Sequence, residues 1–400
     1  MANRNGREPV IVSAARTPIG RFQGSLAGTP ATELGAVAIR EAVKRAGIDG
    51  ADVDEVLMGN VVQAGEGQAP ARQAALKAGL PNTVSATTIN KVCGSGLKTV
   101  MMAAAAIKAG DGDIFIAGGM ENMNQAPYLL PKARFGYRLG NAELVDALVH
   151  DGLWCSFEQH HMGSSAEWVA REYEVTREEQ DAFALRSHQR AWEATQSGKF
   201  KEEIVPVEVK TKKGTTVVES DEPIRSDTSL EALGKLRPAF EEGGTVTAGN
   251  APGLTDGAAA VVVMSREEAE QRAIKPLARI VDYAQAAVDP LALFAAPIYA
   301  VKKLADKMGV GMDHWDLIEM NEAFAAQCLA DIQGLGITDE TVNVHGGAIA
   351  LGHPIGASGA RILTTLIYAL RDRGLKRGLA TLCLGGGEAV ALSIELEDSE

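Results

Sequence analysis

The sequence predicts an α/β protein built from two similar halves with an irregular insertion between them. Three observations support this prediction. Apolar, strand-like stretches alternate with alanine-rich helical stretches along most of the 400 residues, a pattern typical of parallel sheets covered by helices. One succession of turn, helix, strand and glycine run occurs once in each half. The composition changes between about residues 121 and 250, where the regular alternation is lost.

The first copy of this repeat begins at residues 93–98, Cys-Gly-Ser-Gly-Leu-Lys, which open an alanine-rich helix expected to end near Ala109. A glycine and an aspartate then interrupt the helical pattern. An apolar strand is expected over residues 113–117, and it ends in the pair Gly118-Gly119.

The second copy begins at residues 356–361, which open a helix expected to end near Asp372. A strand over residues 379–383 follows and ends in the glycine run 385–387. Because sites in α/β proteins lie at the carboxyl edge of the sheet, we expect the active loops of both halves to lie there.

The insertion begins with residues 121–152, which are rich in Asn, Pro, Arg and Gly. Charged amphipathic helices are expected over residues 165–200, and an exposed hairpin over 201–220 around Lys213. The apolar strand 258–264 then resumes the first half. The composition of the insertion by itself indicates only an irregular segment.

The bulk composition is typical of a globular enzyme and excludes several kinds of partner. Hydrophobic residues make up 46% of the chain and charged residues 23%. The net charge of −13 argues against nucleic acid and anionic membrane surfaces, since both select a basic footprint. The four cysteines have no CxxC spacing, which indicates neither a metal site nor a disulfide framework and fits a reducing compartment.

The ends of the sequence support a cytoplasmic location. The first eight residues are polar and lead directly into a strand, so no signal peptide is expected. The last four residues are acidic and lack a peroxisomal Ser-Lys-Leu address. No apolar run approaches the roughly 20 residues that a membrane span needs. We therefore expect a cytoplasmic protein without a membrane segment.

Cys93 is the first candidate for a chemical role, because it precedes a predicted helix. A helix N-terminus favours a thiolate over a thiol, and Gly94 and Gly96 would let a substrate carbonyl approach the backbone. A lone cysteine is more often a buried core residue. The interpretation changes because the far end of the chain supplies an amide, an imidazole and a second thiol, in Asn321, His353 and Cys383.

Four segments, together with residues 10–20, resemble the thiolase family, and within it the biosynthetic, acetyl-CoA acetyltransferase type. The resemblance covers nearly the whole chain, and the four motifs occur in the family's order and spacing. They are Cys93-Gly-Ser-Gly-Leu-Lys98, Asn321-Glu-Ala-Phe324, Gly352-His-Pro-Ile-Gly-Ala-Ser-Gly-Ala-Arg361 and Cys383-Leu-Gly-Gly-Gly387. The resemblance implies the thiolase fold, in which two five-stranded α/β/α halves form a layered core and carry an inserted loop domain.

The resemblance also implies a chemical role for each motif. Cys93 would be the acylated nucleophile and His353 would take its proton, while Cys383 would exchange the proton on the α-carbon of the second thioester. Backbone N–H groups of Cys93 and Gly385 would form one oxyanion hole, and His353 with a water held by Asn321 would form the other. Two thiols and an imidazole suit a reaction that needs both a covalent nucleophile and a carbon base.

The resemblance carries a set of CoA and acyl-pocket positions to this chain: Leu153, His161, Met162, Arg225, Phe240, Ala248, Pro252, Leu293, Ala323 and Phe324. Coenzyme A would be substrate and product, and no cofactor or metal is expected. Three segments depart from the family pattern. Pro252 replaces a serine that bonds pantetheine, Leu293-Phe294 replaces the usual methionine and glycines, and His345 replaces an asparagine.

The resemblance implies a division into three parts. Residues 1–120 with 251–273 would form the N-terminal thiolase half, and 274–400 the C-terminal half. Residues 121–250 would form the loop domain, which covers CoA and makes the contact of a homotetramer. Apolar anchors in the insertion, at residues 128–131 and 135–137, also suggest a homo-oligomer.

The leading interpretation is therefore an acyltransferase of lipid metabolism that condenses two acetyl-CoA to acetoacetyl-CoA and CoA. One alternative is a 3-oxoacyl-CoA thiolase of fatty-acid breakdown with a broader chain length; another is a non-catalytic thiolase-fold binding protein. The sequence leaves open the physiological direction, the range of acyl chains, the choice of dimer or tetramer, and a regulatory disulfide between Cys93 and Cys383.

Overall fold

The structure is a computed structural model, and it describes residues 7–212 and 214–397. The polar N-terminal residues and the acidic end, on which the expectations about targeting signals depend, lie largely outside the described residues. Lys213, at the centre of the expected hairpin, lies outside them too. The strands flanking it are β10 (Val207–Thr211) and β11 (Gly214–Val218), which pair antiparallel as expected.

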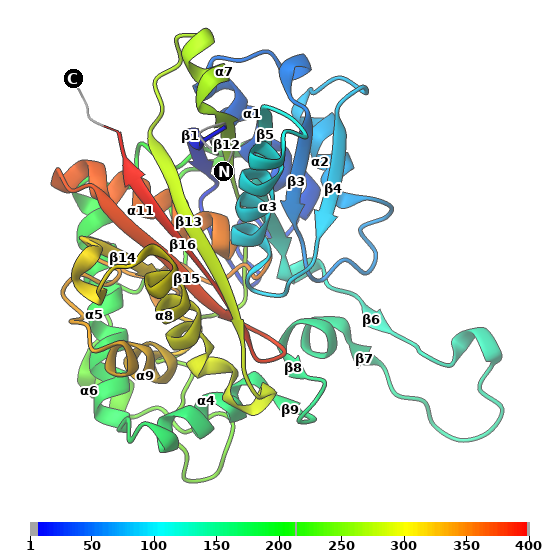
Figure 1. Cartoon of the computed structure of the whole chain (residues 1–400). Helices are drawn as coiled ribbons and strands as arrows, with labels where there is room; N and C mark the ends of the chain where they lie inside the picture. Colours follow the sequence, from blue (N-terminus) through cyan, green and yellow to red (C-terminus); the bar gives the residue numbers. More distant parts are fainter. Residues whose placement is uncertain (1–6, 213, 398–400) are drawn as a thin grey trace.

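One continuous ten-stranded sheet runs through both halves of the protein (Figure 1). The short strand β2 (Gly20–Arg21) pairs with β12 beside the main path. The spatial order of the others is β14 (Leu317–Met320), β15 (Arg377–Leu384), β16 (Glu388–Leu396), β13 (Ala278–Ala287), β1 (Pro9–Arg16), β12 (Thr255–Ser265), β5 (Ile114–Asn122), β3 (Glu55–Gly59) and β4 (Ser85–Ile89).

The strand order repeats between the halves, which confirms the predicted internal duplication of the fold. The order β3-β5-β12-β1 in one half corresponds to β14-β15-β16-β13 in the other. In each set the first pair is parallel and the next two are antiparallel. The expectation of purely parallel sheets is wrong, because the tight glycine turn after β15 makes β16 return as a hairpin. The two halves join where β1 pairs with β13.

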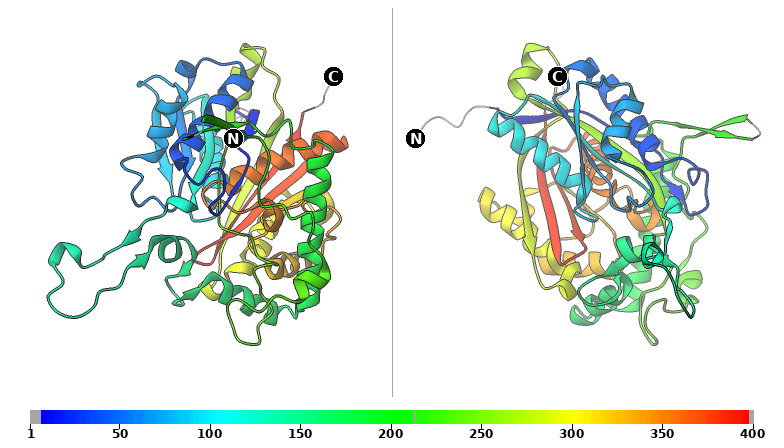
Figure 2. Two further views of the ribbon diagram at one scale, coloured as in Figure 1. Left: turned by 180° about the vertical axis from the view of Figure 1, so that it is seen from behind. Right: turned by 90° about the vertical axis from the view of Figure 1, so that its right-hand side faces the viewer.

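Helices cover both faces of the sheet and fill the space between its halves (Figures 1 and 2). One outer face packs against α1 (Ala31–Ala46) and α2 (Pro70–Ala78), and the other against α8 (Ala296–Met308) and α9 (Ala325–Leu335). The inner faces share one apolar core with α3 (Ser95–Ala109) and α11 (Ser358–Arg373). Two shorter helices are α7 (Arg266–Gln271) and α10 (Ala348–Leu351). The layered α/β core of the predicted fold class is thus present.

The central helix α3 also bears on the expectation about membrane segments. Within the described residues, the segment Val92–Ala109 is long and apolar enough, by length and composition, to cross a membrane. The expectation that no apolar run approaches that length is therefore wrong. The segment is 56% buried inside the protein, as a core helix would be, so it is weak evidence for a span.

The two inner helices meet backbone to backbone near their N-termini. A Cβ atom on Gly96 would lie 2.8 Å from the backbone nitrogen of Ala360 and 3.0 Å from the carbonyl oxygen of Gly356. A Cβ on Gly359 would lie 2.3 Å from the backbone nitrogen of Leu97. Both glycines are therefore required for close helix packing. This contact fixes the start of α3 next to the start of α11.

The insertion contains helices, short hairpins and an arm. Its helices are α4 (Met162–Glu172), α5 (Arg177–Gln196) and α6 (Leu230–Gly234). Its two-residue strands pair as β6 (Tyr128–Leu129) with β7 (Val145–Asp146), and as β8 (Trp154–Cys155) with β9 (His160–His161). The arm around β6 and β7 projects from the body in Figure 1 and in the left view of Figure 2.

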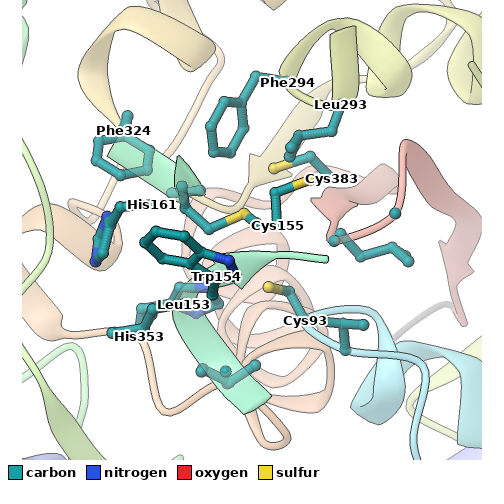
Figure 3. Close-up of a pocket in the computed structure, with 18 of the residues that line it drawn as sticks. Cys93, Leu153, Trp154, Cys155, His161, Leu293, Phe294, Phe324, His353 and Cys383 are labelled. Atoms are coloured by element: carbon teal, nitrogen blue, oxygen red, sulfur yellow. The ribbon is translucent and has the colours of Figure 1, made fainter. Parts of the chain in front are cut away.

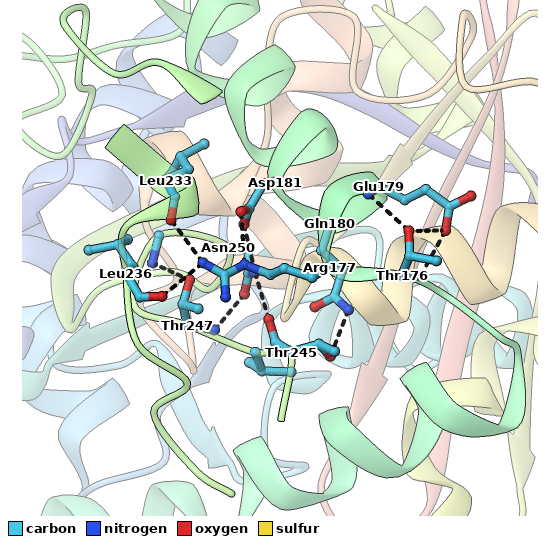
Figure 4. A network of polar contacts seen from close by, with 12 residues as sticks. Thr176, Arg177, Glu179, Gln180, Asp181, Leu233, Leu236, Thr245, Thr247 and Asn250 are labelled. Atoms are coloured by element: carbon cyan, nitrogen blue, oxygen red, sulfur yellow. Dashed lines mark hydrogen bonds and ion pairs between the residues drawn. The ribbon is translucent and has the colours of Figure 1, made fainter. Parts of the chain in front are cut away.

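A buried polar network fastens the end of the insertion to α5 (Figure 4). The Arg177 guanidinium contacts Asp181 at 2.8 Å and donates to the carbonyl oxygens of Leu233 and Leu236. The Asn250 side chain donates to the other oxygen of Asp181 at 3.0 Å. The Asn250 carbonyl accepts from the first N–H of α9. The loop around Asn250 is therefore hydrogen-bonded to both α5 and α9.

Candidate active site

Cys93 lies in a strained turn directly before α3. Val92 has a φ of +46°, a left-handed conformation that is rare for a β-branched residue and costs about 1–3 kcal/mol. Ser95 holds the turn, because its Oγ accepts from Lys91 N at 2.8 Å and donates to the Val92 carbonyl at 2.7 Å. A Cβ on Gly94 would lie 2.4 Å from Leu384, so that glycine makes room for protein and not for substrate, contrary to expectation.

The electrostatics of Cys93 differ from the expected thiolate. Burial raises the pKa of the Cys93 thiol to about 12, although hydrogen bonds from backbone N–H groups, including that of Gly385, act in the opposite direction. The buried Glu121 carboxyl nearby adds to the rise. The expected stabilisation by the helix N-terminus is outweighed by desolvation. The resting nucleophile is therefore a neutral thiol that needs a base.

His353 is buried and held in one tautomer. Ser358 donates its hydroxyl hydrogen to the Pro354 carbonyl at 2.9 Å, so its oxygen accepts from His353 Nδ1 at 2.6 Å. The lone pair is then on Nε2. Burial, with the Arg361 charge as a second cause, lowers the pKa of His353 to about 4. The imidazole is therefore neutral at pH 7, and its Nε2 can accept a proton.

Asn321 approaches the same imidazole. Its Nδ2 lies 3.5 Å from His353 Nε2, and its Oδ1 has no hydrogen-bond partner among the described residues. Asn321 does not cap the following helix, because α9 begins at Ala325 with Phe324 as its N-cap. The Asn321 side chain is thus buried and polar, and it is not used for capping.

Cys383 lies at the carboxyl end of β15, followed by the glycine turn to β16. Burial, with the nearby Cys93 as a second cause, raises the pKa of Cys383 well above its usual value. Gly386 and Gly387 have φ values of +89° and +81°, conformations that favour glycine, in the three-residue loop that joins Leu384 to Glu388. This turn brings the N–H of Gly385 to the Cys93 sulfur. The thiols of Cys93 and Cys383, one from each half of the protein, therefore line the same cavity.

A pocket of about 310 Å³ joins these groups (Figure 3). Most of its lining is apolar, which suits the acyl and pantetheine parts of a thioester more than a charged group. The predicted site residues that line it are Cys93, Leu153, His161, Met162, Pro252, Leu293, Ala323, Phe324, His353, Cys383 and Gly385. Phe294, one of the departures from the family pattern, also lines the pocket.

Four predicted residues lie outside this lining. Asn321 lies beside His353 Nε2, as described above. Phe240 forms a second layer, because its ring stacks on His161 with centroids 4.8 Å apart. Ala248 and Arg225 are exposed, and the backbone N–H of Arg225 donates to His188 Nδ1 at 3.1 Å. The pocket itself therefore contains none of the cations that would contact the phosphates of a nucleotide.

His161 and Met162 enter the pocket from the start of α4. His161 is the N-cap, and its Nδ1 accepts from Gly163 N at 3.1 Å. The proton is then on Nε2, which is left as a donor. Burial lowers the pKa of His161, so this ring is neutral too.

Several residues near the reactive groups were not singled out in the sequence. Trp154, Cys155 and Phe157 line the pocket from the β8–β9 hairpin. The sequence alone predicts a structural role for Cys155, because no motif there provides it with a catalytic partner. The only available signal was their position a few residues before His161, in the segment already assigned to the pocket.

Glu121 connects the two halves behind the reactive groups. Its buried carboxylate accepts from the Gly356 N–H at 2.9 Å and from the N–H groups of Val61 and Val62, both at 3.1 Å. The Asn60 amide donates to it at 3.1 Å. Desolvation raises the pKa of Glu121 to about 8. The loop after His353 is thus anchored on the N-terminal half.

A layered fold with two related halves, and a pocket shared by two thiols and one imidazole, are what the thiolase motifs predict. The thiolase N-terminal domain model matches residues 9–267, and the thiolase C-terminal domain model matches residues 274–396. The chain belongs to the thiolase family.

Characterised relatives point to one type within the family. An acetyl-CoA acetyltransferase of Pseudomonas aeruginosa is 54% identical over 389 residues, 97% of this chain and 99% of the relative. One from Escherichia coli is 56% identical over 387 residues, 96% of this chain and 98% of the relative. The crystal structure of the Bacillus anthracis acetyl-CoA acetyltransferase superposes with a TM-score of 0.97 at 44% identity, covering 99% of this chain and all of that one.

Proposed function

We propose that this protein is an acetyl-CoA acetyltransferase that condenses two acetyl-CoA molecules, reversibly, to acetoacetyl-CoA and CoA. The observation that carries the proposal is the meeting of Cys93, His353 and Cys383 in one apolar pocket. The acetyl-CoA acetyltransferases of similar sequence, which align over nearly the full length, support the choice of substrate. Coenzyme A is substrate and product, and the reaction uses no cofactor.

In the first half-reaction, Cys93 Sγ attacks the thioester carbonyl while His353 Nε2 takes the thiol proton. The pKa values of both groups favour their neutral forms, so the proton moves as the bond to carbon forms. The carbonyl oxygen becomes negative and is stabilised by the N–H groups of Cys93 and Gly385. Coenzyme A then leaves as a thiol by taking the proton of the neighbouring Cys383 thiol, while the proton from Cys93 stays on His353 Nε2.

In the second half-reaction Cys383, which became a thiolate when coenzyme A left, removes a proton from the methyl group of the second acetyl-CoA. Its raised pKa suits this role, because a strong base is needed for a weak carbon acid. The protonated His353 Nε2 and a water held by Asn321 stabilise the enolate oxygen by donating hydrogen bonds to it. The carbanion attacks the acetyl group on Cys93, and the Cys93 thiolate leaves and takes its proton back from His353, which restores all three groups to their neutral forms.

The finer parts of the proposal concern the setting of the enzyme. We assign it to lipid metabolism in the cytoplasm, as a homotetramer. The N-terminal half comprises residues 1–120 and 251–273, the loop domain 121–250, and the C-terminal half 274–400. The loop domain would cover CoA, with Arg225 near its nucleotide. Exposed apolar residues on the arm, such as Phe135 (89% exposed) and Leu139 (100%), support an oligomer contact.

The test is a thiolysis and condensation assay with purified protein. Acetoacetyl-CoA plus CoA should give two acetyl-CoA, and acetyl-CoA alone should give acetoacetyl-CoA when the product is removed. A series of 3-oxoacyl-CoA substrates then distinguishes the short-chain enzyme from a fatty-acid-degrading thiolase. Comparable kcat/KM for 3-oxodecanoyl-CoA and acetoacetyl-CoA would support the latter.

A further inference from the structure

Trp154 is a large side chain in the pocket with no role in the reaction described above. It lies in β8, directly opposite His161 of β9 in the antiparallel pair. Opposite residues project to the same face of a hairpin, so both side chains enter the pocket. Figure 3 shows the indole ring of Trp154 inside the pocket, between His161 and Cys93 in this view.

The indole of Trp154 is not held there by a polar contact. Within residues 7–212 and 214–397, its Nε1 makes no hydrogen bond, whereas Nε1 of Trp315 donates to Ser393 Oγ at 2.9 Å. Trp154 is also only partly buried, since the ring borders the pocket. The side chain therefore presents its surface to whatever occupies the pocket.

The rest of the wall is a chain of packed rings. His161 stacks on Phe240, which contacts Phe324 edge to face with centroids 6.1 Å apart. Phe324 in turn contacts Phe294 at 5.1 Å. Phe294 is buried, with only 3% of its surface exposed. Because each ring is backed by another, this wall cannot move aside easily to admit a longer acyl chain.

We propose that the Trp154 ring sets the upper limit on acyl length, by filling space that carbons beyond a short acyl group would need. The proposal rests on the proposed function, since the acyl group must lie beside Cys93 during the reaction. The pocket has a volume of about 310 Å³, and Trp154 has the largest side chain among the residues that line it. The substrates excluded are medium-chain 3-oxoacyl-CoA thioesters, and those accepted have short acyl chains.

The test compares Trp154→Ala with Trp154→Phe, which keeps a ring but removes the N–H. The quantity measured is the ratio of kcat/KM for 3-oxohexanoyl-CoA to that for acetoacetyl-CoA. One methylene in an apolar pocket is commonly worth 10–200-fold in such ratios, so we expect a rise of about tenfold or more in Trp154→Ala. The ratio in Trp154→Phe should stay within about twofold of the wild type.

The matched control is Trp192→Ala, because Trp192 is 42% exposed on α5 and is not part of the pocket lining. Its ratio should not change. Trp154→Leu, a milder truncation, is measured alongside and should show a smaller rise, so the proposal stays testable if Trp154→Ala does not fold. An unchanged ratio in the folded Trp154 truncations, or an equal rise in Trp154→Phe, would overturn the proposal.

The same experiment separates this inference from the proposed function. A wild-type protein that cleaves no 3-oxoacyl-CoA would refute the function itself. A wild-type protein that cleaves acetoacetyl-CoA, with truncated variants of unchanged preference, would refute only the role of Trp154.

Discussion

At the scale of single residues, the reactive groups are neutral at rest, and their protons must move during the reaction. The Cys93 thiol has a raised pKa and the His353 imidazole a lowered one, both mainly because of burial. An ion pair between them would be costly in this environment. The fixed tautomer of His353, set by Ser358, is therefore as important as its basicity.

Replacing the proposed nucleophile should abolish the acyl-enzyme. We expect the wild-type chain to gain one acetyl group on incubation with acetyl-CoA, and Cys93→Ala to gain none. Intact-protein mass spectrometry checks this directly, and thiolysis should fall by about a thousandfold or more. Acetylation that persists in Cys93→Ala would show that another residue is the nucleophile.

Replacing Cys383 should separate the two half-reactions. We expect Cys383→Ala still to become acetylated, because Cys93 and His353 are intact. It should fail to form acetoacetyl-CoA and to exchange methyl hydrogens of acetyl-CoA with deuterated solvent, which NMR measures. Exchange at the wild-type rate would assign the carbon base to another group.

His345 should contribute to loss of stability in acid. Burial, with Arg373 as a second cause, lowers its pKa to about 4 from an ordinary value of 6.5. Between about pH 6.5 and pH 4, this histidine binds a proton in the unfolded chain but not in the folded chain. The free energy of unfolding therefore decreases as the pH falls through this range. In His345→Asn the drop in Tm over this range should be smaller, while His150→Asn, at an exposed site, should match the wild type. An unchanged drop in His345→Asn would contradict this.

The residues that sequence reasoning missed share a physical cause. Trp154 and Cys155 reach the pocket through a two-residue strand pair, which produces no periodic pattern in the sequence. The direction of the Cys93 pKa shift depends on how much protein surrounds the turn, which local motifs do not reveal. Conversely, His353 and Cys383 were found because each lies in a glycine-rich turn of distinctive composition.

At the scale of elements, the sequence predicted most of the helices and strands that position the site. The helix after Cys93 ends at Ala109 as expected, and the strand before the last glycine run contains the expected residues 379–383. What could not be predicted was the antiparallel pairing of β12 with β5 and of β16 with β15, because the sequence does not show which strands become neighbours in the sheet.

The contact between α3 and α11 should not tolerate a side chain. In Gly359→Ala the new Cβ would meet the backbone of Leu97 at 2.3 Å, so the helices must separate. We expect a loss of stability of about 1–3 kcal/mol or more, with kcat falling because Cys93 and His353 move apart. Gly28→Ala is the control, because nothing lies within 4 Å of its Cβ position. Thermal unfolding and thiolysis rates measure both; a Gly359→Ala enzyme as stable and active as the control would refute the role of this contact.

At the scale of the whole molecule, the arm should support self-association. Tyr128, Phe135, Leu139 and Leu144 are all more than 60% exposed on a segment that projects from the body. We expect light scattering at micromolar concentration to give a mass near four times 42.1 kDa. Leu139→Asp should shift the protein toward smaller species, whereas Leu230→Asp, at an exposed site on α6, should not. A wild-type monomer would contradict the assembly.

The position of β12 in the sheet has a consequence for how the chain folds as it is made. β1 and β5 do not pair with each other; β12, residues Thr255–Ser265, lies between them. On the ribosome, the N-terminal half therefore stays an open sheet with an empty strand position until more than 260 residues have been synthesised. Its exposed strand edges can pair with neighbouring chains during that interval. Nascent protein should thus need protection by chaperones until β12 emerges and closes the sheet.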